Sequence, residues 1–240
     1  MKQIQLLLAA LLLFLQVGCE TTRNFTYERQ QRYHNVLIVS SIGDKLTANK
    51  TKNYLLAIQN NVYREPLGEQ AFVEEIEDFV QSKLSGRVPF NLVTMHDFYP
   101  ENKDEANDIF NNLMRYKKTS DLLLRNNFDA LILVRGNRIL YGHPYDGIDK
   151  IYEEVGLYKE GNKDWFFTHF TFSFINAEND HEFSEYKLNK IPYTTTKLNW
   201  KSSKGPWKDS ELPLLVEEAI VLTEDSLNLI IEDMFFSPNE

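Results

Sequence analysis

Apolar runs that alternate with an amphipathic segment constrain the fold of this chain most strongly. Val36–Ile42 and Phe128–Val134 are apolar and rich in β-branched or large residues, which is typical of buried strands. Between them, Glu69–Leu84 repeats hydrophobic residues every three or four positions, which predicts a helix with one buried face. Strands that alternate with helices predict a partly parallel sheet covered by helices. The acidic residues of this helix are expected on its solvated side: Glu74, Glu75, Glu77 and Asp78.

The remaining segments complete an α/β prediction. Phe90–Met95 is expected to form a second core strand. Tyr54–Tyr63 is compatible with either a helix or a strand, and a strand paired with the first is favoured. Trp165–Ile175 alternates in polarity, which predicts one half-buried antiparallel strand with His181–Leu188 as its hairpin partner. Glu211–Met234 carries a hydrophobic stripe and predicts a long C-terminal helix. The prediction is therefore a single α/β domain over residues 36–240, with a mixed, mostly three-layer sheet, flanking helices and a β-hairpin in its C-terminal half. The polar face of the predicted half-buried strand is expected to carry His169, Thr171 and Ser173.

The first 18 residues have the composition of a secretory signal peptide. Lys2 precedes Leu6–Leu15, a run that contains only Leu, Ala and Phe. As a helix, this run would cover roughly half of the ~30 Å hydrocarbon core of a membrane. A cleaved leader is therefore a better interpretation than a membrane-spanning segment.

The end of the leader, Val17-Gly18-Cys19, resembles the lipobox of bacterial lipoproteins, in which small residues precede a cysteine. One position departs from the family pattern, because Gln16 stands where a leucine is usual. The resemblance implies that Cys19 is alkylated by diacylglycerol, that the leader is cut before it, and that its new amine is acylated, usually with palmitate. In that family an aspartate after the cysteine retains the protein at the inner membrane, so Glu20 implies the outer membrane, facing the periplasm. Ordinary signal-peptidase cleavage and an uncleaved apolar anchor are the alternatives.

Composition supports this location and excludes several kinds of chemistry. Cys19 is the only cysteine, so it has no disulfide partner within the chain and would be a reactive thiol if left unmodified. The absence of a second cysteine also excludes a CxxC zinc site. The net charge of −9 disfavours nucleic-acid binding, which needs clustered Lys and Arg. No cofactor or metal is expected. The polar residues 19–35 are interpreted as a lipidated tether.

The order of elements resembles the small α/β domains of periplasmic lipoproteins, such as the TolB N-terminal domain and the CsgG-like group. This resemblance rests on element order, so no functional residue is carried over from it. A second pattern, Ile42-Gly43-Asp44 after an apolar strand, resembles the Gly-Asp-Ser-Leu block of SGNH hydrolases. Lys45 occupies the place of the nucleophilic serine, and no Asp-x-x-His pair follows near the C-terminus. No catalytic residue is assigned.

Three groups of residues remain as candidates for contact with a ligand or partner. The first follows a strand, at the edge where open α/β sheets bind ligands. The second lies in a loop with Pro144 and Gly147, and the third pairs two tryptophans with nearby lysines. They support two hypotheses: a non-enzymatic envelope protein that binds a protein or cell-wall partner, or a degenerate hydrolase whose site lies around Asp44, His96 and His143. The pair that follows the strand is His96 and Asp97, the pair in the loop is His143 and Asp146, and the two tryptophans are Trp200 and Trp207.

Overall fold

The computed structural model describes the greater part of the chain beyond the leader. The described residues are 25–42, 45–54, 57–66, 69–98, 117–136, 138–142, 149–153, 155–160, 163–178, 183–187, 193–195 and 212–237.

A mixed five-stranded sheet lies at the centre of the fold, in the order β11-β10-β5-β1-β4. Strand β1 is parallel to both β4 and β5, whereas β10 is antiparallel to both β5 and β11. The two apolar runs form the inner strands β1 and β5, as predicted, because strands covered on both faces need apolar residues on both. The bounds are β1 Asn35–Ser40, β4 Asn91–Thr94, β5 Ala130–Gly136, β10 Phe170–Asn176 and β11 Phe183–Lys187.

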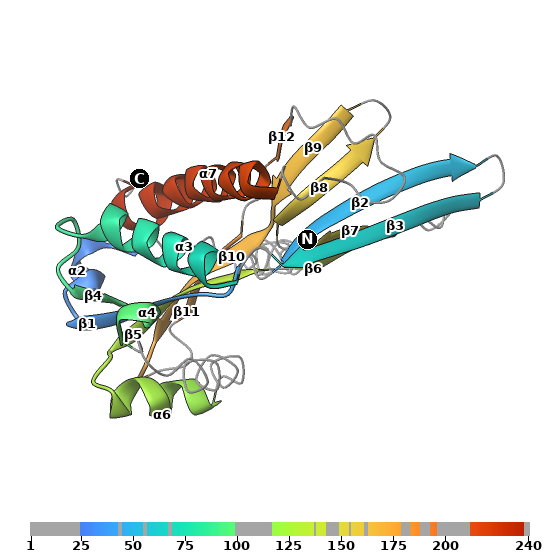
Figure 1. The fold of residues 1–240 in the computed structure, drawn as a ribbon. Helices are drawn as coiled ribbons and strands as arrows, with labels where there is room; N and C mark the ends of the chain where they lie inside the picture. Colours follow the sequence, from blue (N-terminus) through green and yellow to red (C-terminus); the bar gives the residue numbers. More distant parts are fainter. Residues whose placement is uncertain are drawn as a thin grey trace, which may run out of the picture.

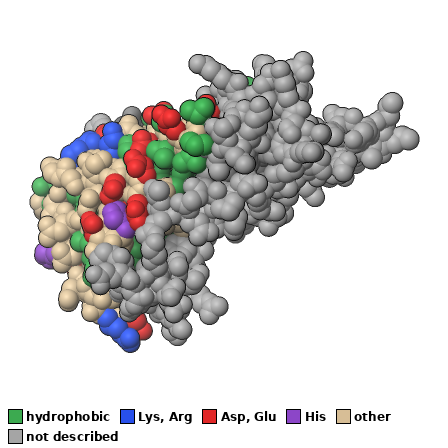
Figure 2. Space-filling view, in the orientation of Figure 1, with side chains coloured by type: hydrophobic (Ala, Val, Ile, Leu, Met, Phe, Trp, Pro, Cys, Tyr) green, Lys and Arg blue, Asp and Glu red, His purple; other side chains and the backbone are tan. Residues whose placement is uncertain are grey.

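Two long helices cover one face of this sheet, α3 (Glu69–Leu84) and α7 (Leu212–Ile231). Both were predicted, and a short π-helix, η2 (Glu232–Phe236), extends α7. Figure 2 shows acidic and hydrophobic side chains next to one another over the layer that these helices form. The buried residues of this layer and the strand residues beneath it form one hydrophobic cluster, which includes Phe72, Ile76, Val80, Leu84, Leu215, Ala219, Leu227, Val36, Ile38, Ile132 and Val134.

Shorter helices cover the other face, α4 (Met95–Phe98) and α6 (Lys117–Arg125). A second hydrophobic cluster joins Met95 and Leu123 of these helices to the alternate residues of β1 and β5. Helices therefore flank both faces of the mixed sheet, which confirms the predicted α/β class.

A second five-stranded sheet, in the order β12-β9-β8-β2-β3, extends from the first (Figure 1). A strand, β3, covers most of the segment Tyr54–Tyr63, but its expected pairing with the first strand is wrong, because β3 pairs antiparallel with β2 along its whole length. Strands β6 and β7 pair antiparallel and form a separate two-stranded sheet. The bounds are β2 Lys45–Tyr54, β3 Ala57–Pro66, β6 Arg138–Gly142, β7 Asp149–Glu153, β8 Val155–Glu160, β9 Lys163–Thr168 and β12 Tyr193–Thr195.

The predicted strand Trp165–Ile175 is two strands, β9 and β10, that belong to different sheets and meet at His169. Its expected polar face is also buried, since Thr171 and Ser173 are 0% and 4% exposed. Alternating polarity along a strand predicts a solvated polar face only when no other element covers that face. In β10 both faces are covered. The predicted hairpin partner is confirmed, because β11 pairs antiparallel with β10.

The described chain begins inside the core. Phe25 is 5% exposed, its backbone N–H donates to the carbonyl of Met234 at 3.3 Å, and its ring lies 4.3 Å from that of Phe174. Helix α2 (Tyr27–Gln30) follows, and Gln30 Nε2 donates to the carbonyls of Phe25 and Phe235. The interpretation of residues 19–35 as a tether is therefore wrong from Phe25 onward, because Phe25 already lies in the core. Helix α2 and the C-terminal end of β2 lie at opposite ends of the described molecule (Figure 1).

Candidate functional site

A buried carboxylate, Glu77 of α3, links the ends of two parallel strands. Its side chain is 1% exposed, although the sequence predicts it on the solvated side of the helix. Oε1 accepts the backbone N–H of Ser40, the last residue of β1, at 2.9 Å. Oε2 accepts the backbone N–H of His96, just after β4, at 3.2 Å. Both oxygens are therefore satisfied, as a buried carboxylate requires.

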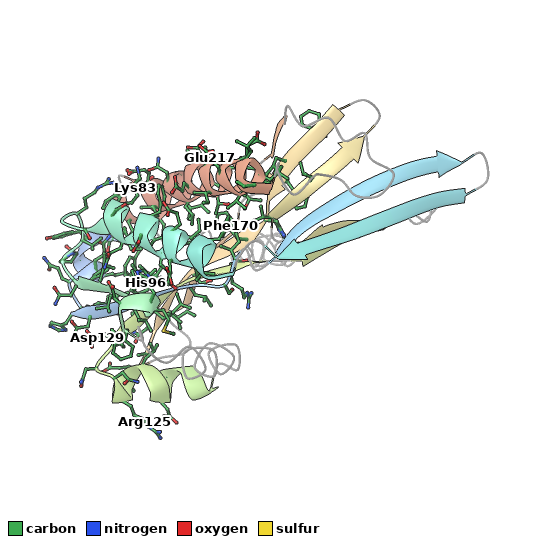
Figure 3. All side chains as sticks on the ribbon, in the orientation of Figure 1. Lys83, His96, Arg125, Asp129, Phe170 and Glu217 are labelled. Carbon is green, nitrogen blue, oxygen red and sulfur yellow. The ribbon has the colours of Figure 1, made fainter. Side chains whose placement is uncertain are left out.

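The ring of His96 lies between the carboxylates of Glu77 and Asp78. His96 is labelled in Figure 3. Nδ1 is 2.9 Å from Oε2 of Glu77, and Nε2 is 3.2 Å from Oδ1 of Asp78. Asp97 is the third acid, with its Oδ1 3.9 Å from Nε2. An imidazolium can donate from both ring nitrogens, so this arrangement favours the charged form of His96.

The pKa values at this site follow from burial and these contacts. Burial of the Glu77 carboxyl raises its pKa, and the hydrogen bonds from Ser40 and His96 offset only part of that shift. Burial of the His96 ring acts to lower its pKa, but the hydrogen bond and charge of Glu77, with the charges of Asp78 and Asp97, outweigh it and raise the pKa overall. Both shifts mean that the folded protein keeps the protons on Glu77 and His96 to a higher pH than the ordinary pKa values would allow.

Thr94 holds the turn that presents His96. It is fully buried at the end of β4, and its Oγ1 accepts the backbone N–H of Asp97 at 3.3 Å. This bond is an N-cap of α4, which explains why the chain turns sharply after the strand. Oγ1 also lies 3.4 Å from Nε2 of His96, so the cap and the ring restrain each other.

The site lies at the carboxyl ends of β1 and β4, where open α/β sheets bind ligands. Its chemistry is that of a partly exposed, charged histidine among carboxylates, with His96 24% exposed. Because both ring nitrogens already face carboxylates, what this arrangement can do is respond to pH. Within the described residues, no group of three or more His, Cys, Asp or Glu side chains is placed to hold a metal ion.

Only one predicted pair, His96 and Asp97, falls on described residues, and the two lie together on α4. Sequence reasoning missed Glu77, the residue that organises the site. The available signal was its position, four residues after Val73 and three before Val80, at the margin of the buried stripe of α3. The other candidates lie outside the described residues: Cys19, Asp44, His143, Asp146, Trp200 and Trp207.

Comparison with known proteins adds no assignment. No protein-family model, curated protein or solved structure matches this chain. Among the helices that the structure describes, none combines the length and the apolar character needed to cross a membrane.

The raised pKa of His96 predicts that stability depends on pH. The folded state holds this proton above the ordinary His pKa of about 6.5, so its contribution is complete below that pH and is lost as pH rises through the folded pKa. The free energy of unfolding should therefore fall above about pH 6.5, by at most about 1.4 kcal/mol per pH unit for one proton. Urea denaturation across this range measures the slope.

His96→Gln should flatten that slope. The matched control is His34→Gln, because His34 also lies beside a carboxylate, 3.3 Å from Oδ2 of Asp129, but is 81% exposed. Its pH profile should follow that of the wild type. An unchanged slope in His96→Gln would contradict the role assigned to the ring.

Proposed function

We propose that this chain is a lipid-anchored protein of the bacterial cell envelope, held at the outer membrane through Cys19. In this proposal its body is a single three-layer α/β domain in the periplasm that binds a protein or cell-wall partner and does not catalyse a reaction. The leader, the small residues before Cys19 and the solitary cysteine support the anchor.

The observation that carries the proposal is the packing of Phe25 so soon after Cys19. A fully extended chain between these residues spans only about 20 Å. Because Phe25 is buried against Phe174 and Phe235, an anchor at Cys19 would act on the folded domain through a short link. That arrangement suits a protein whose task is to present a domain at the membrane.

The same geometry would set the orientation of the domain. Strand β1 starts at Asn35, close to α2, and ends at Ser40. The Glu77–His96 site at its carboxyl end would therefore face away from the membrane, and the β2–β3 hairpin would extend furthest from it (Figure 1). A partner in the periplasm could reach both.

Binding is favoured over hydrolysis by the surroundings of His96. A buried carboxylate on Nδ1 is the arrangement that orients a general base, so a degenerate or unrecognised hydrolase is the second candidate. However, a general base needs a free Nε2, and this atom is 3.2 Å from Oδ1 of Asp78. The hydroxyl that lies 3.4 Å from Nε2, Oγ1 of Thr94, is buried and already caps α4. These contacts suit a structural or binding role.

Cys19→Ser tests the anchor directly. In the full chain expressed in a bacterium with lipoprotein-processing enzymes, the wild type should sediment with membranes and incorporate labelled palmitate. The Cys19→Ser variant should lose the label and move to the soluble fraction, because without its acyl chains the protein has no durable membrane attachment.

Gly18→Ala is the matched control for this test. It keeps a small residue before the cysteine, so lipidation and membrane attachment should persist. If Cys19→Ser remained in washed membranes, the lipoprotein proposal would be wrong.

A further inference from the structure

The outward face of α7 carries an exposed apolar stripe. Leu214, Val221 and Leu229 are 58%, 51% and 66% exposed. They are separated by about two helical turns each, so they lie along one side of the helix. Leu215 and Ala219, which lie about 100° and about 140° round the helix from Leu214, are fully buried in the core. The stripe is therefore additional to the residues that α7 needs for packing.

Carboxylates surround this stripe without compensating positive charge from the same helix. Residues 212–236 contain no Lys or Arg. Burial, then the charges of Glu75 on α3 and of Asp225, raise the pKa of Glu224, and Lys83 of α3 offsets only part of this shift. Glu232 is paired with Arg87 at 2.6 Å, which leaves Glu217 and Asp225 as the acids available to a partner. Figure 2 shows the resulting mixture of acidic and hydrophobic surface. The acidic residues of this segment are Glu217, Glu218, Glu224, Asp225, Glu232 and Asp233.

We propose that this face, the α7 outer face, docks a basic amphipathic helix of a partner protein. Apolar residues of that helix at i, i+3/i+4 and i+7 would pack on Leu214, Val221 and Leu229. Its Lys or Arg residues would lie opposite Glu217 and Asp225, where complementary charge fixes the register and speeds association.

Charge complementarity selects this occupant over two others. A second copy of the chain would bring an identical acidic face, and the carboxylates would repel. An anionic membrane surface would be repelled for the same reason. The proposal rests on the partner-binding part of the proposed function and is independent of the lipid anchor.

A defined peptide probe tests this surface. The full chain, purified in a nonionic detergent, is titrated against a fluorescent Leu/Lys peptide of about 21 residues, long enough to reach along most of α7. A second peptide of the same composition has its order scrambled, which removes the apolar face but keeps the charge. Fluorescence anisotropy should show binding of the first peptide that is at least about tenfold tighter than that of the scrambled one, and that weakens with added salt.

Three variants locate the contact. The triple variant Leu214→Ser, Val221→Ser, Leu229→Ser should bind the amphipathic peptide about tenfold or more weakly, without loss of folding because the residues are exposed. Glu217→Gln with Asp225→Asn should lower both the affinity and its salt dependence. Leu124→Ser on α6 is the matched control, since Leu124 is another exposed leucine, at 47%, and its affinity should match the wild type.

Any of three results would overturn the proposal that the α7 outer face docks a basic amphipathic helix. Equal binding of the scrambled peptide would mean non-specific charge attraction, and equal weakening by Leu124→Ser would place the contact elsewhere. Self-association that the triple variant abolishes would make a second copy the occupant. If Cys19→Ser releases the protein from membranes but the wild type does not bind the amphipathic peptide, only the α7 outer face is contradicted. If the wild type binds the peptide but Cys19→Ser remains in washed membranes, only the anchor is contradicted.

Discussion

Replacing Glu77 with alanine should lower the free energy of unfolding by about 3–5 kcal/mol, because it leaves one buried donor unsatisfied and removes a hydrogen bond to a charged group, at about 1–3 and about 1.5–3 kcal/mol. The substitution leaves the backbone N–H groups of Ser40 and His96 without their acceptor, and the first of these is buried. An unsatisfied buried donor alone costs about 1–3 kcal/mol. The carboxylate that faces His96 Nδ1 is lost as well.

Thermal and urea denaturation at neutral pH measure this effect, which corresponds to a decrease in melting temperature of about 2–4 °C per kcal/mol. Glu75→Ala is the matched control, because Glu75 is an exposed acid on the same helix. Its stability should stay within about 0.5 kcal/mol of the wild type. A Glu77→Ala variant as stable as Glu75→Ala would show that the buried carboxylate does not join α3 to the strand ends.

The elements that could be predicted are those whose burial pattern is local. Helix α3 has the predicted bounds, Glu69–Leu84, because its hydrophobic spacing and the following Gly86, which has a positive φ of 72°, mark both the face and the end. Strands β1 and β5 were predicted because an apolar run of strand length needs cover on both faces. The long C-terminal helix followed from the same periodicity.

What the sequence did not reveal depends on groups far apart in the chain. A carboxylate on a helix is normally solvated. Glu77 can be buried because backbone N–H groups at the ends of β1 and β4 donate hydrogen bonds to it. Thr171 and Ser173 are buried because β10 is covered on both faces, which alternation alone does not indicate. The break at His169 reflects a change from one sheet to the other. His96 was a candidate from its position after a strand, but its carboxylate partners on α3 required the fold.

Replacing Phe25 with alanine is the second change expected to have a large effect. Loss of a buried phenylalanine typically costs about 3–5 kcal/mol, and Phe25 also contacts the rings of Tyr33, Phe174 and Phe235. Because these contacts join the start of the domain to β10 and to η2, the segment 25–34 should open more readily than the rest. Hydrogen exchange should detect faster exchange at the Phe25 amide, which donates to Met234, together with a lower melting temperature.

Tyr27→Ala is the matched control, since Tyr27 is an aromatic residue of the same segment but is 59% exposed. Its stability should change by less than about 1 kcal/mol. The difference bears on the proposed anchor, because release of residues 25–34 would lengthen the reach from Cys19 to the first fixed residue from about 20 Å to about 50 Å. A lipidated Phe25→Ala protein should therefore keep its membrane attachment while its domain moves further from the bilayer. Unchanged exchange at the Phe25 amide in that variant would contradict a close link between anchor and core.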